Sequence, residues 1–375
     1  MTQKKANKKL CDAATSGDVV AAAAAIGAGA DVNATDQWHR TPLLLAAEKG
    51  CTDLARLLIE KGADPTARDY RRRTPLRWAA ESGKTDLARL LIENGADPNA
   101  KNNGQGTPLH WAAENCHTEV ARLLIEKGAD PNARNNWSRR RRTPLHLAAA
   151  KGHTGLARLL IEKGADPNAM DEWEQTPLHL AAAKGYADLA RLLIEKGADP
   201  NAVDKWRRTP LHLAAETGHA DLARLLIEKG ADPNAVNDDQ QTPLHLAAAN
   251  SHTEVANLLA TAERWRRYVK PLLDADQKLD VTELVDRAGQ PTEALKNLLP
   301  NDLFGDLARP DFYRQGMDGV VLVFLYLPEA VQASIDLAPY RRAKALEANA
   351  ASGPEKGIER YVRTRRAPSS DFSRE

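Results

Sequence analysis

Histidine is the residue type in this chain best suited to metal binding or acid–base chemistry, and the sequence contains ten. Nine of them recur at two fixed positions of a repeated pattern. The first set is His110, His146, His179, His212 and His245, and the second is His117, His153, His219 and His252. A metal or catalytic site needs a few side chains that converge at one place. Nine histidines belong to the repeated pattern and only His39 lies outside it, so we expect no metal site.

Carboxylates gather most closely in residues 274–283, whose spacing resembles a calcium-binding EF-hand loop. Such a loop has about 12 residues with a glycine at the sixth position. This segment has 10 residues from its first aspartate to Glu283 and no glycine. We therefore expect a helix start capped by Asp280 or Thr282. The chain also lacks a phosphate-binding P-loop, an HExxH zinc motif and a GxSxG nucleophile motif. We expect no cofactor and no enzymatic activity.

Binding chemistry is concentrated in seven short segments, called the tips below, that each precede a Thr-Pro pair. The tips are residues 36–40, 69–73, 102–106, 135–142, 171–175, 204–208 and 237–241. Aromatic and arginine side chains, which are typical of binding hot spots, are frequent in them. The candidate partner-binding residues are Trp38, His39, Arg40, Tyr70, Arg71, Arg72, Arg73, Trp137, Arg139, Arg140, Trp173, Trp206, Arg207 and Arg208. The alternative is that each aromatic packs on a neighbouring tip and each arginine is simply solvated.

A repeat explains how these tips are positioned. The Thr-Pro pairs begin at Thr41 and recur at spacings of 33, 33, 36, 33, 33 and 33 residues. A second block, ARLLIEKGADP, recurs with little change from Ala55 onward. Threonine is a good helix N-cap, proline fits the first helical position, and glycine ends a helix. The leucines of the second block lie at helical spacing. Each unit is therefore predicted to be helix, turn, helix and loop.

This unit resembles the ankyrin repeat, whose pattern is T-P-L-H-x-A-A-x-x-G-H, then a helix, then G-A-D-x-N-A. Residues 143–149 read TPLHLAA, Gly152-His153 follows, and residues 164–169 read GADPNA. The resemblance covers about residues 8–262. It implies an all-α solenoid of about eight helix-turn-helix units with hairpin-like loops. It also implies that the motif histidines bond to neighbouring loop backbone, and that a partner is gripped by the tips and the adjoining concave face.

The ends of the repeat region diverge from the pattern, as the end caps of a solenoid do. We expect a polar N-terminal tail at 1–7 and a repeat domain at 8–262, with degenerate caps at 8–40 and 242–262. Residues 263–350 are predicted to be mainly helical, and 351–375 to be a disordered tail. The region after 262 matches no family pattern. It is either an extension packed on the last repeat or a separate effector or enzymatic domain.

Several repeats depart from the pattern inside their helices. Trp78 and Trp111 replace the second leucine of TPLHL, and Arg77 replaces its histidine. These tryptophans either fill the core or form an aromatic spot on the concave face, and we count both as candidate binding residues. Cys116 and Ser251 stand where glycine is usual. If the backbone there is left-handed, each costs on the order of 1 kcal/mol.

The favoured function is a protein-binding scaffold or adaptor. Lysine and arginine number 52 against 51 acidic residues, so net charge favours no class of partner. The arginines of the tips suggest an acidic protein partner. Nucleic-acid binding through the same arginines and tryptophans is an alternative. Acidic residues in the tips at 171–175 and 237–241 favour a protein over a phosphate backbone.

Two further features of the sequence indicate the cellular compartment of the protein. The longest strongly apolar run, 320–327, is too short for a membrane helix, which needs about 20 residues. Cys11, Cys51 and Cys116 are few and far apart, which suits a reducing compartment. We expect a cytoplasmic protein, and the sequence gives no indication of a secreted effector.

Overall fold

The computed structural model describes residues 2–268, and these residues contain sixteen α-helices, one short 3₁₀ helix and no strand. The chain divides into two compact units, Met1–Ala256 and Asn257–Glu375. Of the second unit only residues 257–268 are described, as the end of the last helix. The segment at 274–283, the helices expected as far as 350 and the tail at 351–375 all lie outside the described residues.

The helices form eight consecutive pairs, which confirms the predicted repeat architecture. The first helices of the pairs are α1 Gln3–Ser16, α3 Pro42–Lys49, α5 Pro75–Glu81, α7 Pro108–Glu114, α9 Pro144–Lys151, α11 Pro177–Ala183, α13 Pro210–Glu216 and α15 Pro243–Ala249. The second helices are α2 Val19–Gly27, α4 Thr52–Glu60, α6 Thr85–Glu93, α8 Thr118–Glu126, α10 Thr154–Glu162, α12 Ala187–Glu195, α14 Ala220–Glu228 and α16 Thr253–Tyr268. Helix α1 thus takes in most of the polar stretch at 1–7.

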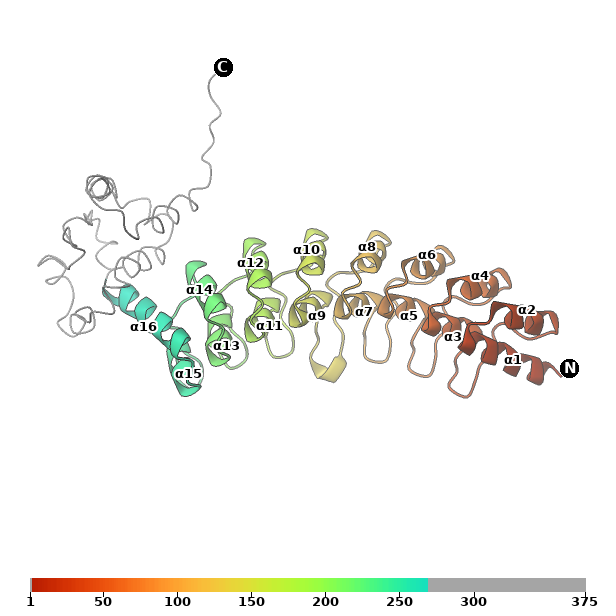
Figure 1. The fold of residues 1–375 in the computed structure, drawn as a ribbon, viewed down its shortest axis with the longest axis horizontal. Coiled ribbons are helices and arrows are strands. Elements are labelled where there is room, and N and C mark those ends of the chain that lie inside the picture. Colours follow the sequence, from red (N-terminus) through yellow and green to blue (C-terminus); the bar gives the residue numbers. More distant parts are fainter. Residues whose placement is uncertain (1, 269–375) are drawn as a thin grey trace, which may run out of the picture. The chain divides into compact units, whose positions relative to one another are not determined.

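Successive first helices pack on one another, and successive second helices form a parallel row (Figure 1). The tips project from the side of the first helices, away from the second helices. Leucine and alanine fill the space between the rows: Leu54, Leu58 and Ala46 have no exposed surface. Each buried leucine contributes about 1.5–3 kcal/mol through the hydrophobic effect. No described helix has the length and apolar character needed to cross a membrane.

The Thr-Pro pairs start the first helices as predicted. In α9 the hydroxyl oxygen of Thr143 accepts the amide hydrogen of His146, and Pro144 occupies the first helical position. The helix ends at Gly152 in the left-handed conformation, with φ of 75°. Cys116 and Ser251 adopt the same conformation, with φ of 62° and 61°. The backbone at these two positions is therefore the kind that glycine tolerates best.

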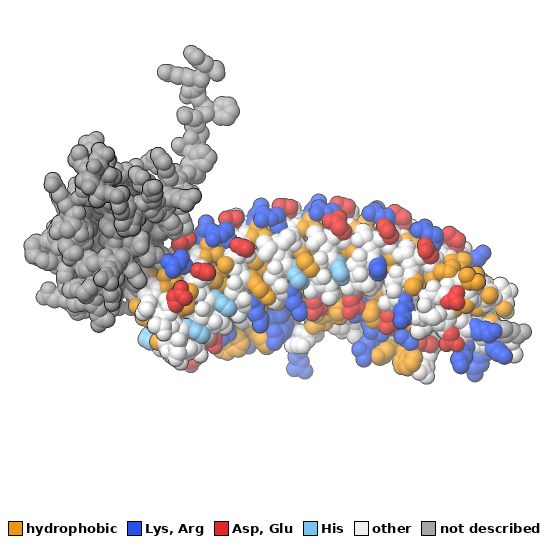
Figure 2. All heavy atoms as spheres, in the orientation of Figure 1, with side chains coloured by type: hydrophobic (Ala, Val, Ile, Leu, Met, Phe, Trp, Pro, Cys, Tyr) orange, Lys and Arg blue, Asp and Glu red, His pale blue; other side chains and the backbone are white. Residues whose placement is uncertain are grey.

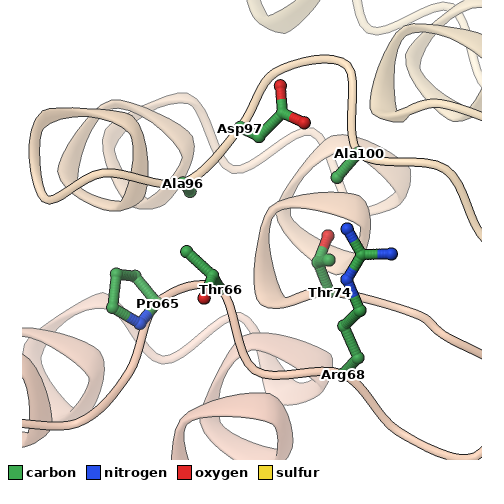
Figure 3. Close-up of a pocket in the computed structure, with 7 residues that line it drawn as sticks. All are labelled: Pro65, Thr66, Arg68, Thr74, Ala96, Asp97 and Ala100. Carbon is green, nitrogen blue, oxygen red and sulfur yellow. The ribbon is translucent and has the colours of Figure 1, made fainter.

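Asparagine side chains tie each repeat to the next along the loops after the second helices. Asn132 is typical: its amide donates to the Gly164 carbonyl at 2.8 Å and its oxygen accepts from the Asp166 amide at 2.9 Å. Equivalent pairs of bonds are made by Asn33, Asn99, Asn168 and Asn201. Thr66 replaces this asparagine and turns its hydroxyl to Asp64. A small hollow lies beside Thr66, facing Asp97 of the next repeat (Figure 3).

Candidate partner-binding surface

Each tip is a tight hairpin organised by its first residue. In the tip at 36–40 the Asp36 amide donates to the Arg40 carbonyl at 3.0 Å. One carboxylate oxygen of Asp36 accepts from the amides of Trp38 and Arg40, both at 2.9 Å. His39, the fourth residue, is left-handed with φ of 59°. We did not predict this role from the sequence, although aspartate or asparagine at the start of all seven tips was the available signal.

Backbone hydrogen bonds join the seven tips into one continuous row, called the tip row below. The second residue of every tip after the first donates its amide to a carbonyl of the preceding tip. The six bonds are Tyr70–Trp38 at 3.3 Å, Asn103–Arg71 at 3.1 Å, Asn136–Gly104 at 2.6 Å, Glu172–Arg140 at 2.8 Å, Lys205–Trp173 at 2.9 Å and Asp238–Trp206 at 3.1 Å. The tips are therefore positioned relative to one another rather than independently.

Most arginines of the tip row fall into two groups. The last arginine of several tips pairs with a buried or half-buried aspartate: Arg40 with Asp36 at 2.9 Å and Arg208 with Asp204 at 2.9 Å. Arg73 pairs with Asp69 in the same way, and Arg142 pairs with Asp171 of the following tip. These arginines hold the hairpins together. A second group is exposed to solvent, and it comprises Arg71, Arg72, Arg139, Arg141 and Arg207.

The aromatic residues of the tip row divide in a similar way. Trp38, Tyr70 and Trp206 are exposed over 47%, 49% and 43% of their surfaces. Trp137 and Trp173 are half-buried. The Trp173 ring centroid lies 6.1 Å from that of Trp206, and the Arg140 guanidinium lies 4.1 Å from the Trp173 ring. Packing on neighbours therefore describes Trp137 and Trp173, whereas the three exposed rings are accessible to a partner.

A compact arrangement of arginine and tryptophan lies on helices α5 and α7. The guanidinium carbon of Arg77 is 4.0 Å from the Trp78 ring centroid and 4.0 Å from that of Trp111. Arg77 is 6% exposed, and both tryptophans are half-buried. We call Arg77, Trp78 and Trp111 the Arg77 stack. Its tryptophans are half-buried, so they lie neither fully in the core nor fully exposed to solvent.

Trp137 extends this stack from the inserted tip at 135–142. Its ring centroid lies 4.5 Å from that of Trp111. It covers the neighbouring glycine tip, where a Cβ atom on Gly104 or Gly106 would come within 2.7 Å of the indole. The two glycines therefore make room for Trp137. The packing of Trp137 explains why the tip at 102–106 has glycines and no aromatic residue of its own. We did not predict this from the sequence.

Electrostatics differ between the stack and the histidines beside it. Burial lowers the pKa of Arg77 to about 10, against the raising effect of Glu81, so the guanidinium stays charged near neutral pH. Burial also lowers the pKa values of His110 and His146 to about 4. The Nε2 of His146 donates to the Gln175 carbonyl at 2.9 Å, while Nδ1 accepts from the Thr143 amide at 3.3 Å. These neutral histidines link helices α7 and α9 to the tips that follow them.

Charge along the tip row changes sign. The tips at 69–73 and 135–142 are rich in arginine, whereas 171–175 and 237–241 carry Glu172, Glu174, Asp238 and Asp239. In Figure 2 basic and hydrophobic side chains gather along the edge where the tips project, and the opposite edge mixes basic and acidic side chains. Within the part of the chain that the structure describes, no group of histidine, cysteine and acidic residues could hold a metal ion.

Comparison with known proteins agrees with this architecture. The family described as "Ankyrin repeats (3 copies)" matches residues 10–102, 71–135, 133–204 and 178–266. No curated protein matches the chain. Ankyrin repeats generally mediate protein–protein interactions, and the fold is typically a non-enzymatic binding scaffold. Because the matches extend from residue 10 to 266 of 375, the chain belongs to the ankyrin-repeat family.

Proposed function

We propose that this protein is an adaptor that grips an acidic segment of a protein partner with its tip row and the adjoining face of the first helices. The observation that carries the proposal is the continuous row of hydrogen-bonded tips with exposed aromatic rings. Trp38, Tyr70 and Trp206 each expose more than 40% of their surfaces. The hydrogen bonds between tips hold these three residues in fixed positions along the row. The stacking of repeats does not require large exposed aromatics, but they are typical of binding hot spots.

The exposed arginines give the partner its expected chemistry. Arg71 and Arg72 lie beside Tyr70, and Arg139 and Arg141 lie on the inserted tip. Their positive charge favours carboxylates and speeds association with an acidic surface. The acidic residues of later tips disfavour a uniform phosphate backbone as the ligand. A cytoplasmic location is part of the proposal, supported by the free thiols of Cys11, Cys51 and Cys116.

The proposal is tested by affinity capture from nuclease-treated lysate with quantitative mass spectrometry. The tip variant carries Trp38→Ser, Tyr70→Ser and Trp206→Ser. The control variant carries Arg56→Ser and Arg89→Ser, which are exposed on second helices α4 and α6. We expect a protein that the wild type and the control capture and the tip variant loses. Equal capture by all three proteins would refute the tip surface, and loss of capture on nuclease treatment alone would indicate nucleic acid.

A further inference from the structure

Asn103, in the tip at 102–106, is followed by a glycine, and such a pair can react without an enzyme. The backbone nitrogen of the glycine attacks the side-chain carbonyl carbon of the asparagine, and ammonia leaves. Glycine favours this attack because it has no Cβ atom in the way. The chain contains two such pairs, Asn94-Gly95 and Asn103-Gly104. Their surroundings differ in the features that control this reaction.

The first pair is held by hydrogen bonds at the end of helix α6. The Gly95 amide, which would be the attacking group, donates to the Ile92 carbonyl at 3.0 Å. The side-chain amide of Asn94, which would be attacked, donates to the Leu90 carbonyl at 2.8 Å. Reaction at Asn94 therefore requires that the helix end open first.

The backbone nitrogen of Gly104 is free because its tip begins with asparagine. In the four tips that begin with aspartate, the carboxylate accepts the amide hydrogen of the third residue at 2.9–3.0 Å. Gly104 is the third residue of its tip, and the side-chain oxygen of Asn102 accepts instead from Gly106, at 2.9 Å. Within the described part of the chain, the Gly104 amide donates to no protein acceptor.

The side chain of Asn103 is also available for the reaction. Asn103 is exposed to solvent. Its Nδ2 lies 3.5 Å from the Tyr70 carbonyl oxygen, beyond the usual donor–acceptor range of about 2.7–3.2 Å. The side chain can therefore turn toward the Gly104 nitrogen without breaking a strong bond. Both reacting groups are accessible in the folded tip, which is not the case at Asn94.

We propose that Asn103 is a site of spontaneous deamidation in the folded protein. The Gly104 nitrogen forms a bond to Cγ of Asn103 and the Cγ–Nδ2 bond breaks. The amide proton of Gly104 leaves with Nδ2 as ammonia, and a cyclic imide remains. Water then opens the imide at either of its two carbonyl carbons. The products are aspartate and isoaspartate, in which the main chain runs through the former side-chain carbon.

Either product changes the middle of the tip row. Both carry a negative charge next to the tip of Tyr70 and Arg71, where it repels the acidic segment that we propose as the ligand. Isoaspartate also lengthens the backbone between residues 103 and 104. The bonds that these two residues make, to Arg71 at 3.1 Å and to Asn136 at 2.6 Å, join three tips. Deamidation should therefore weaken binding, and this consequence, unlike the reaction itself, rests on the proposed function.

The experiment measures the reaction rate at both pairs in the same full-length chain. Samples are kept under mildly alkaline conditions, digested at acidic pH, and analysed for aspartate and isoaspartate at 94 and 103 by peptide mass spectrometry. We expect Asn103 to react about tenfold faster than Asn94, because two hydrogen bonds restrain only the latter. In concentrated urea the two should react at similar rates. Reaction of the folded chain at Asn94 as fast as at Asn103 would overturn the inference.

The variant Asn102→Asp tests the free amide directly, because it gives this tip the first residue that holds the third amide in four other tips. We expect it to slow deamidation at Asn103 by about fivefold, the effect of one ordinary hydrogen bond. High salt in both samples screens the added charge. An unchanged rate would show that the free Gly104 amide does not control the reaction.

The effect on binding is tested separately by affinity capture with Asn103→Asp and Asn103→Gln. Glutamine keeps the amide and the neutral charge, so we expect it to capture the partner as the wild type does and Asn103→Asp to capture less. Equal capture by the two variants would refute the effect on binding but not the modification site. If the wild type captures no protein, the proposed function fails, whereas the rates at Asn103 still decide the modification.

Discussion

Cys116 occupies a backbone position that glycine occupies in most other repeats of this chain. Its φ of 62° matches that of Gly152, at 75°. A left-handed residue with a Cβ atom is strained, although glycine loses more entropy on folding. We expect Cys116→Gly to raise the free energy of unfolding by about 0.5–1 kcal/mol, measured by urea denaturation. The reverse change, Gly185→Cys, should be destabilising, because a Cβ there would lie 2.6 Å from the His219 ring.

Thr66 interrupts the line of asparagines that connects successive repeats. Thr66→Asn should restore the bonds to the next repeat that Asn132 makes at 2.8 and 2.9 Å. One or two partly exposed hydrogen bonds add about 1 kcal/mol to the free energy of unfolding. The urea midpoints of Thr66→Asn and of the opposite change, Asn132→Thr, provide the measurement. Midpoints that move in the same direction would contradict this account of the loops.

At the scale of the helices, the buried histidines make stability depend on pH. The folded pKa values of His110 and His146 are about 4, below the ordinary value of 6.5. Between about pH 4 and pH 6.5 the unfolded chain therefore binds more protons than the folded chain. Stability is therefore fully present above about pH 6.5 and falls as the pH drops towards 4. Each of these histidines contributes roughly 3 kcal/mol to that loss.

The measurement is the urea midpoint between pH 7.5 and 4.5. His146→Gln is a suitable comparison, because glutamine keeps a donor and an acceptor but does not titrate in this range. We expect a shallower decline with pH in the variant than in the wild type. Parallel declines would show that other groups, rather than His146, cause the acid sensitivity.

Sequence reasoning predicted the helices well because their signals are local. Thr143 and Pro144 start a helix by their own chemistry, and the leucines that follow have helical spacing. The tips were located correctly, but the two kinds of arginine in them were not distinguished. Arg207 has a left-handed backbone, and this conformation turns the chain so that Arg208 comes back beside Asp204. That pairing depends on a conformation that the residue types alone do not specify.

The Arg77 stack was only partly predictable for a different reason. Arg77 and Trp111 are 34 positions apart and lie in different repeats, so their contact exists only after the repeats have stacked. The sequence marks Trp78 and Trp111 as unusual, yet it could not show that one guanidinium contacts both rings. Trp137 is a candidate binding residue by its sequence position in a tip, and the structure packs it against Trp111 over two glycines.

At the scale of the repeat array, the hydrogen-bonded tip row is the feature that turns repeated units into one surface. Each repeat contacts only its neighbours, so the spacing of Trp38, Tyr70 and Trp206 is set by the stacking of the units between them. A partner that spans several tips must match both the spacing of these aromatic residues and the charges, which change sign along the row. The proposed adaptor function is therefore a property of the array rather than of any single repeat.

Site-specific photo-cross-linking tests this central claim most directly. A benzophenone amino acid replaces Trp38, Tyr70 or Trp206 on the tip row, or Arg56 or Arg89 on the second helices, in cells that produce the protein. The account predicts covalent attachment of one protein at all three tip positions and none at the two helix positions. Attachment at the helix positions alone, or attachment of nucleic acid at the tips, would contradict it.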